Sequence, residues 1–314
     1  MSITITGGFT LDGGGLTITA APLPPSAGNK AIFGYGSSSG ARSMTNLVSN
    51  TGVVATDTTG VGTARSGLAA AGYGTDKAIF GYGYNAGQQS MTNLVSNTGV
   101  VATDTTGVGT ARYDLTAATY GTDKAIFGYG TITSATSITN LVSNTGVVAT
   151  DTPGVAGTRS RLAAAGYGTD KAIFGYGTGA PSGSLSTTNL VSNTGVVADN
   201  TTGVGTARYA LGAASYGTDK AIFGYGYGGG YQSMTNLVSN TGVVATDTTG
   251  VGTVRTAIAA ATYGTDRAIF GYGSNGTSPF VLSITNLVSN TGVVATDTTG
   301  VGTARNYLAA AAYG

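Results

Sequence analysis

Four residue types are missing from this chain of 314 residues: cysteine, histidine, tryptophan and glutamate. Without cysteine the chain can form neither disulfides nor thiolate–metal bonds. Histidine, cysteine and glutamate also supply many of the general bases, nucleophiles and transition-metal ligands of enzymes. We therefore expect a protein that is not an enzyme and that needs no cofactor or metal.

Charge is also scarce, with 14 basic and 13 acidic residues and a net charge of +1. A balance so close to neutral provides no basic surface for nucleic acid or for an anionic membrane. Apolar runs are shorter than a membrane span requires, and residues 1–28 lack the basic start and apolar centre of a secretory signal. We expect no nucleic-acid partner, no membrane insertion and no secretory signal.

Glycine is plentiful, with 54 residues, and much of it recurs within a repeat of about 47 residues. Each copy contains AIFGYG followed by TNLVSNTGVV or a close variant. One spacing is 49, and its two extra residues lie between Gly177 and Asn189. A period of this size is typical of stacked or radially arranged supersecondary units. The phenylalanine that marks the six copies recurs at Phe33, Phe80, Phe127, Phe174, Phe223 and Phe270.

The second copy contains four segments with strand character. They are Leu68–Tyr73, Lys77–Gly83, Met91–Ser96 and Val100–Thr106. A Gly-Thr-Asp turn separates the first from the second, and an Asn-Thr-Gly turn separates the third from the fourth. Helical periodicity is absent from the copy. The sequence therefore predicts an all-β protein with a four-stranded antiparallel sheet in each repeat.

Six such sheets can form a closed ring or an open solenoid. The array begins at Asn29 with the second strand of a repeat, and Leu308–Gly314 has the sequence of a first strand. Pairing this C-terminal strand with the first copy would leave no unfinished sheet edge. Four strands per unit also favour the ring. We therefore predict a six-bladed β-propeller over residues 29–314, closed by the C-terminal strand completing the first blade.

The composition of the strands fits this arrangement. The first strand is rich in alanine, which is expected where the innermost strands of six blades converge on a central channel. The Phe and Tyr of AIFGYG are expected further out, where they would fill the space between neighbouring sheets.

The pattern Arg65-x-x-LAAA-x-YG-x-DKAIFGYG, followed after a loop by TNLV, resembles the kelch repeat over about residues 29–314. In that family an arginine precedes the first strand, a double glycine ends the second and an aromatic residue marks the later strands. Here the double glycine is Gly-Tyr-Gly, and the tryptophan of the fourth strand is absent. The resemblance implies a propeller that serves mainly as a binding platform, although a few relatives are enzymes.

Charged residues recur at fixed positions in the copies. An aspartate on the fourth strand, an arginine in the link and an Asp-Lys turn could form a metal site or an acid–base pair. We interpret them as structural ion pairs and hydrogen-bonded turns, because catalytic sites are rarely repeated six times. The fourth copy instead has Asp199-Asn200 on this strand. The recurring residues are Asp57, Asp104, Asp151, Asp247 and Asp297 on the strand, and Arg65, Arg112, Arg159, Arg208, Arg255 and Arg305 in the link.

Two segments vary between the copies, namely the loop after the second strand and the two residues after the link arginine. In an antiparallel sheet these segments emerge at one end, and the invariant turns emerge at the other. Their Tyr, Ser, Gly, Asn and Gln residues are typical of adaptable recognition surfaces and would suit sugars; drift in exposed loops is the alternative. The candidate ligand-binding residues are Tyr84, Gln88, Gln89, Tyr113, Asp114, Tyr209, Tyr227, Tyr231, Gln232, Phe280 and Tyr307.

Residues 1–28 differ from the repeats. Thr alternates with Ile or Leu around a GGG turn and a Pro-rich stretch follows, which predicts a hairpin and a stiff linker. Such a segment ahead of a repeat array resembles the attachment segments of phage tail and fibre proteins. We hypothesise a virion component that binds host glycan or protein through its variable face and contacts other virion proteins through residues 1–28. The alternatives are a decoration protein without a ligand, an engineered propeller and a sugar-modifying enzyme.

Overall fold

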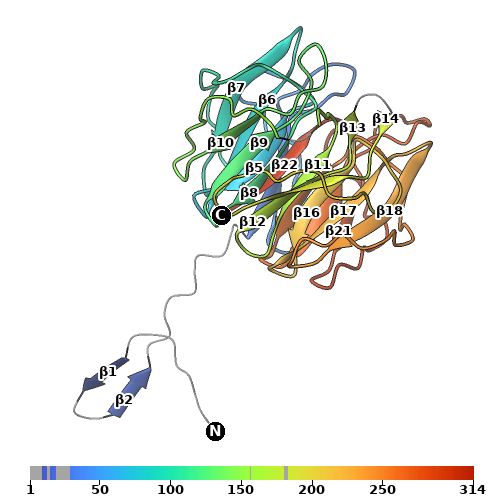
Figure 1. Cartoon of the computed structure of the whole chain (residues 1–314). Helices are drawn as coiled ribbons and strands as arrows, with labels where there is room; N and C mark the ends of the chain where they lie inside the picture. The colour runs from blue at the N-terminus through green and yellow to red at the C-terminus, as the bar shows by residue number, and fades with distance from the viewer. Residues whose placement is uncertain (1–8, 13–14, 19–28, 156, 180–182) are drawn as a thin grey trace.

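The computed structural model describes residues 9–12, 15–18, 29–155, 157–179 and 183–314, and all regular secondary structure in these ranges is β (Figure 1). In the N-terminal segment, β1 (Phe9–Asp12) pairs antiparallel with β2 (Gly15–Ile18), which confirms the predicted hairpin. The proposed linker after the hairpin lies outside the described residues. The described part of the chain contains no helix that could cross a membrane.

The repeats form six antiparallel sheets of three strands each, which we number 1 to 6 in the order of the copies. A two-stranded hairpin, β13 (Thr178–Gly179) and β14 (Gly183–Ser184), accompanies sheet 4. From inner to outer strand, the sheets are β22 (Ala309–Tyr313), β3 (Lys30–Gly34) and β4 (Thr45–Val48); β5 (Ala69–Tyr73), β6 (Lys77–Tyr84) and β7 (Gln88–Val95); β8 (Thr116–Tyr120), β9 (Lys124–Gly128) and β10 (Thr139–Val142); β11 (Ala163–Tyr167), β12 (Lys171–Gly175) and β15 (Thr188–Val191); β16 (Gly212–Tyr216), β17 (Lys220–Tyr227) and β18 (Tyr231–Val238); and β19 (Ala259–Tyr263), β20 (Arg267–Gly271) and β21 (Thr285–Val288).

Sheet 1 joins the two ends of the repeat array. The C-terminal strand β22 pairs with β3, so that Ala310 lies opposite Phe33 and Tyr313 lies opposite Lys30. This register matches that of β5 on β6, where Ala70 lies opposite Phe80. The predicted pairing of the C-terminal strand with the first copy is therefore confirmed.

The inner strands lie at the middle of the array, and outer strands such as β7 and β18 lie at its periphery (Figure 1). Each inner strand contacts the inner strands of the sheets before and after it, and β22 contacts both β19 and β5. The six inner strands enclose a cavity of about 170 Å³ that is lined mainly by alanine. Small side chains fit here because bulkier ones would collide where the strands converge.

The predicted fourth strand is irregular in the structure. In the second copy Val101 bridges Val95 and Thr105 bridges Thr92, so the five residues 101–105 oppose the four residues 92–95. This extra residue is a β-bulge, which breaks the ladder. The carbonyl of Ala102 accepts a hydrogen bond from the Asn93 side chain. The prediction of four regular strands per repeat was therefore wrong in its last strand.

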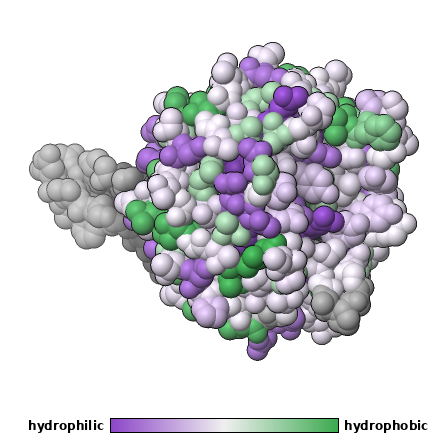
Figure 2. Space-filling model, turned by 90° about the horizontal axis from the view of Figure 1, so that it is seen from above, coloured by the Kyte–Doolittle hydropathy of each residue, from purple (hydrophilic) through white to green (hydrophobic). Residues whose placement is uncertain are grey.

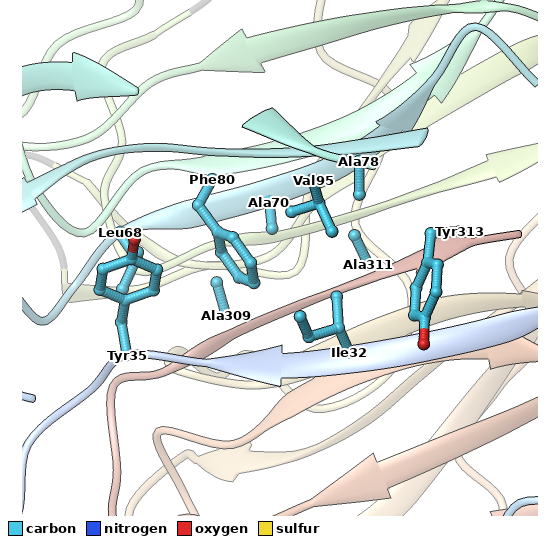
Figure 3. Packing of buried hydrophobic residues seen from close by; sticks show 10 residues of the cluster. All are labelled: Ile32, Tyr35, Leu68, Ala70, Ala78, Phe80, Val95, Ala309, Ala311 and Tyr313. Carbon is cyan, nitrogen blue, oxygen red and sulfur yellow. The ribbon is translucent and has the colours of Figure 1, made fainter. Parts of the chain in front are cut away.

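Aromatic side chains fill the space between neighbouring sheets, as predicted. Phe80 points from sheet 2 toward Ile32 and Tyr35 of sheet 1, and its ring centroid lies 5.1 Å from that of Tyr35 (Figure 3). A Cβ added to Gly34 would lie 2.7 Å from the Phe80 ring. Glycine is needed here because the ring packs directly on the backbone of the next sheet. The same glycine–phenylalanine contact recurs between all the sheets.

A buried arginine joins each link to two sheets. Arg65 has no exposed surface, and its guanidinium lies 4.5 Å from the centroid of the Tyr35 ring in sheet 1. It donates hydrogen bonds to the carbonyl of Tyr82 (2.7 Å) and to Oδ1 of Asn93 (2.6 Å), both in sheet 2. Asp104 completes the group, with its Oδ1 3.8 Å from Arg65 Nη1. The predicted structural ion pair is confirmed here and at Arg208–Asp247 and Arg305–Asp57.

The same aspartate also holds the link. Asp104 accepts hydrogen bonds from the backbone N–H and the hydroxyl of Thr63 and from the Asn93 amide. We call this arrangement the aspartate clamp. Partial burial acts to raise the pKa of Asp104, but the hydrogen bonds from Thr63 and Asn93 outweigh it and lower the pKa below the ordinary value of 3.8. In sheet 1 the clamp joins Asp57 to Thr303, 246 residues away.

We predict that Asp104→Asn will lower the free energy of unfolding by about 1–3 kcal/mol, because the amide cannot replace every hydrogen bond accepted by the carboxylate. Chemical denaturation would measure this change. Asp199→Asn is the matched control, since Asp199 is an exposed aspartate one position from the equivalent site. Equal effects of the two substitutions would contradict the clamp.

We also predict acid sensitivity. The pKa of the five clamp aspartates is lower in the folded protein than the ordinary value of 3.8, so each contributes stability above that value and loses it as the pH falls below about 4. The melting temperature should therefore fall between pH 6 and pH 3. Asp104→Asn, which has one clamp carboxylate fewer, should show a smaller fall. A wild-type melting temperature that rises toward pH 3 would refute this account.

Candidate functional site

The two variable segments of each repeat lie together, as the antiparallel topology predicts. Ser66, which follows a link arginine, bridges Tyr84 after the second strand, and Tyr209 bridges Tyr227 in the same way. The invariant turns gather at the other end of the sheets, where Asn193 of one turn donates a hydrogen bond to Asp170 of another. The end with the variable segments is called the variable face below.

Six residues at the centre of the variable face form a closed ring of backbone hydrogen bonds. Each occupies the second position after a link arginine, and its N–H donates to the carbonyl of the preceding member at 2.7–3.0 Å. Each has a φ between 50° and 60°, in the left-handed region, which costs a non-glycine residue about 1–2 kcal/mol. The members are Gly67, Asp114, Arg161, Ala210, Ala257 and Tyr307.

The six members of the ring have the same backbone conformation and differ only in their side chains. A pocket of about 70 Å³ lies at the ring, and its lining includes apolar residues of the link ends. Two neighbouring members of the ring carry opposite charges. Arg161 Nε donates to Asp114 Oδ2 at 2.7 Å. The pocket is therefore asymmetric, with both charges on one side.

Asp114 and Arg161 differ in exposure. The Asp114 side chain is 7% exposed and that of Arg161 is 40% exposed. Burial raises the pKa of Asp114, although Arg161 counters the effect. A Cβ at position 67 would lie 2.9 Å from Asp114 Oδ1, so Gly67 makes room for the carboxylate. Asp114 is thus an anchored acceptor, and Arg161 presents its guanidinium to the pocket.

Tyrosines extend from Arg161 across the variable face. The guanidinium lies 5.8 Å from the centroid of the Tyr209 ring. The Tyr209 and Tyr227 centroids are 5.5 Å apart, and those of Tyr227 and Tyr231 are 5.3 Å apart. Burial raises the pKa of Tyr307, and the charges of Arg161 and Asp114 also act on it. We call Asp114, Arg161, Tyr209, Tyr227, Tyr231 and Tyr307 the central cluster.

A second aromatic pair lies between sheets 2 and 3. The ring centroids of Tyr84 and Tyr113 are 5.3 Å apart in an edge-to-face arrangement. Tyr84 is 43% exposed. Gln88 donates from its side chain to the carbonyl of Ile132 in the loop of the next copy. These three residues form a half-exposed surface that spans two copies.

The remaining candidates are more separate. Gln89 and Gln232 donate to carbonyls of their own loops, at Asn85 and Gly228 respectively, so their amides support the loops. Phe280 is 67% exposed on the long loop of the sixth copy.

The structure corrects three details of the sequence-based site. Six candidates that were expected in loops lie at the ends of β6, β7, β17 and β18, because these strands continue past a bulge: Tyr84, Gln88, Gln89, Tyr227, Tyr231 and Gln232. Asp114 was expected on the exposed rim but is buried in the ring. Arg161 was not a candidate, although it stands in a variable position of a chain with few charges, and that was the available signal.

Neither the arrangement of the acidic side chains that the structure describes nor comparison with known proteins assigns a metal site or a family to the chain. Among the described residues, no group of three or more Asp side chains is arranged to hold a metal ion. A scan against protein-family models matched no family. A search of curated proteins found no match.

Proposed function

We propose that this chain is a non-enzymatic recognition module, a component of a phage virion that binds host glycan or protein through the variable face. The observation that carries the proposal is the position of the side chains that differ between copies. Asp114, Arg161 and the tyrosines around them lie at one end of the array, on a backbone that the repeats fix. Variation confined to one face of a rigid scaffold is characteristic of binding surfaces.

The proposal includes a fold, a six-bladed kelch-like β-propeller over residues 29–314. Two observations support it: the inner strands contact one another in a cycle, and β22 completes sheet 1 beside β3. Each blade would consist of three strands and one irregular outer segment. The loops between second and third strands, and the links between blades, would form the binding face.

The chemistry of the variable face suits recognition of polar ligands. Tyrosine provides a flat apolar surface with a hydroxyl at its edge, so it can contact a sugar face and also form hydrogen bonds. In the view of Figure 2, which is not confined to the variable face, apolar residues form separate patches between hydrophilic ones. In the virion, residues 1–28 with the β1–β2 hairpin would attach the module to other virion proteins.

We predict that replacing Tyr84, Tyr113 and Tyr231 together by Ala will abolish binding to host cells or to a glycan array. The three side chains belong to the two aromatic groups of the variable face, and each buried aromatic contact in an interface is often worth more than 1 kcal/mol. Binding of the labelled protein to host cells would measure the loss.

The control changes three tyrosines whose rings are buried between the sheets and are not exposed on the variable face. Tyr→Phe changes at Tyr73, Tyr167 and Tyr263 remove hydroxyls but keep the buried rings, and they should leave binding unchanged. If the alanine variant folds and still binds host cells normally, the variable face is not the recognition surface.

A virion decoration protein is a second candidate, and one observation favours it. Six valines that follow the invariant Asn-Thr-Gly turns are each about two-thirds exposed, so the repeat presents one exposed apolar side chain per copy at the same position. They could contact a repeating protein surface. The valines are Val53, Val100, Val147, Val196, Val243 and Val293.

Replacing all six valines by Ser separates the two candidates. A decoration protein should lose its co-sedimentation with phage particles, because the apolar contacts are gone, and should keep it when Tyr84, Tyr113 and Tyr231 are changed. Under the recognition proposal the valine variant should still bind host cells. Normal particle binding by the valine variant would argue against the decoration candidate.

A further inference from the structure

The ring at the centre of the variable face carries an acid and a base at only two adjacent positions. The other four members are Gly67, Ala210, Ala257 and Tyr307, which bear no charge. The backbone of the ring is the same at every position, so this asymmetry comes entirely from the side chains. Such a pocket can orient a ligand that itself has a charged end.

The ion pair leaves part of the Arg161 guanidinium available. Its hydrogen bond to Asp114 uses Nε. Among the described residues, none accepts a hydrogen bond from Nη1 or Nη2 of Arg161. These two nitrogens form a planar fork that matches a carboxylate in a two-bond arrangement. Asp114 holds the fork in place from the side, and the 40% exposure of the arginine side chain leaves it open to solvent.

We propose that this pocket binds the carboxylate of an acidic sugar, such as a uronic or sialic acid residue. The proposal rests on the recognition function above and names its ligand class. The carboxylate accepts hydrogen bonds from the Arg161 fork. A face of the sugar ring lies against Tyr209, and Asp114 and Tyr307, which also line the pocket, supply polar groups for the sugar hydroxyls.

The surroundings of the pocket favour a sugar over a peptide. The cavity of about 70 Å³ admits only a small group such as a carboxylate, so the rest of the ligand lies outside it on the variable face. Beyond the cavity, Tyr209, Tyr227 and Tyr231 continue as an aromatic surface over which further sugar units can extend. Tyr231 is supported from the next loop, because a Cβ on Gly276 would lie 2.5 Å from its ring.

The test is calorimetric titration of the full chain with two pairs of probes that differ in the carboxylate. Trigalacturonic acid is compared with the neutral galactose trisaccharide of the same linkage, and 3′-sialyllactose with lactose. We expect an acidic member to bind at least tenfold more tightly than its neutral partner and to weaken as salt is raised. Preference for one acidic probe over the other distinguishes a uronate from a sialate.

Substitution of Arg161 provides the second part of the test. Arg161→Gln should weaken acidic-sugar binding at least tenfold, because it removes the charge and both Nη donors. Arg161→Lys, which keeps the charge and loses the fork, should fall between. Arg42→Gln is the matched control, since Arg42 bonds only Ser38 and Ser39 in the loop of the first copy and should leave binding unchanged. Arg161→Gln also leaves the buried Asp114 carboxylate without its charged partner, so its melting temperature should fall, and binding is measured at a temperature where the variant is fully folded.

Three results would overturn the inference. The first is absence of binding to either acidic probe, and the second is equal binding of acidic and neutral probes. The third is binding of an acidic peptide instead, with the same dependence on Arg161. If neutral glycans or host cells bind and depend on Tyr84 and Tyr113 but not on Arg161, the recognition function stands and the acidic-sugar pocket alone fails.

Discussion

The buried guanidinium of each link is the interaction on which the rest of the structure depends. Arg65 lies over Tyr35 of one sheet and donates to Tyr82 and Asn93 of the next, so a single buried side chain contacts both sheets. A charge without exposed surface must have its hydrogen bonds made, or it would be strongly destabilising. This requirement explains why the arginine, its tyrosine and its asparagine are repeated with little change. Arg305 repeats the arrangement between Tyr272 and Tyr35, and the two ends of the array are therefore joined by the same contacts as any neighbouring pair.

The variable face depends on these arginines because its central ring begins two residues after each one. Once the guanidinium is fixed, the chain that follows has little freedom, and its N–H groups reach the carbonyls of the neighbouring link. The left-handed φ values of Asp114, Arg161 and Tyr307 are maintained by this ring, although each costs free energy. Because the ring uses only backbone groups, the side chains there can change without loss of the scaffold. Stability and the proposed recognition would thus depend on different atoms of the same segment.

The sequence was sufficient for most of the features that repeat, but not for the irregular outer segment of each copy or for contacts that occur once. The strands, the antiparallel order, the pairing of β22 with β3 and the aromatic packing all follow from periodic patterns, and their signal is present in every copy. The irregular outer segment was missed because its alternation of residues resembles a strand, whereas in the structure the Ala102 carbonyl at the bulge accepts a hydrogen bond from the Asn93 side chain. The pairing of Asp114 with Arg161 joins residues 47 positions apart in two different links. No local pattern indicates it, and only the positions of the links in space bring the two charges together.

The link between sheets 3 and 4 shows what the aspartate clamp requires. In the other links a glycine such as Gly109 has a φ of 75°, and a Cβ there would lie 2.4 Å from the clamp carboxylate Asp151. The link into sheet 4 has Ala156 at this position and Gly157 where the clamp threonine normally stands, and its sheet has Asn200 in place of the aspartate. Both partners therefore differ here: a carboxylate without the threonine would lose its hydroxyl donor, and the threonine without the carboxylate would lose its acceptor. Arg159 in this link pairs through Nη1 with Tyr176 and Thr187, and its buried Nε has no partner among the described residues. The link glycine is therefore needed only where the clamp aspartate is present. In the link into sheet 4, where asparagine replaces the aspartate, alanine replaces the glycine.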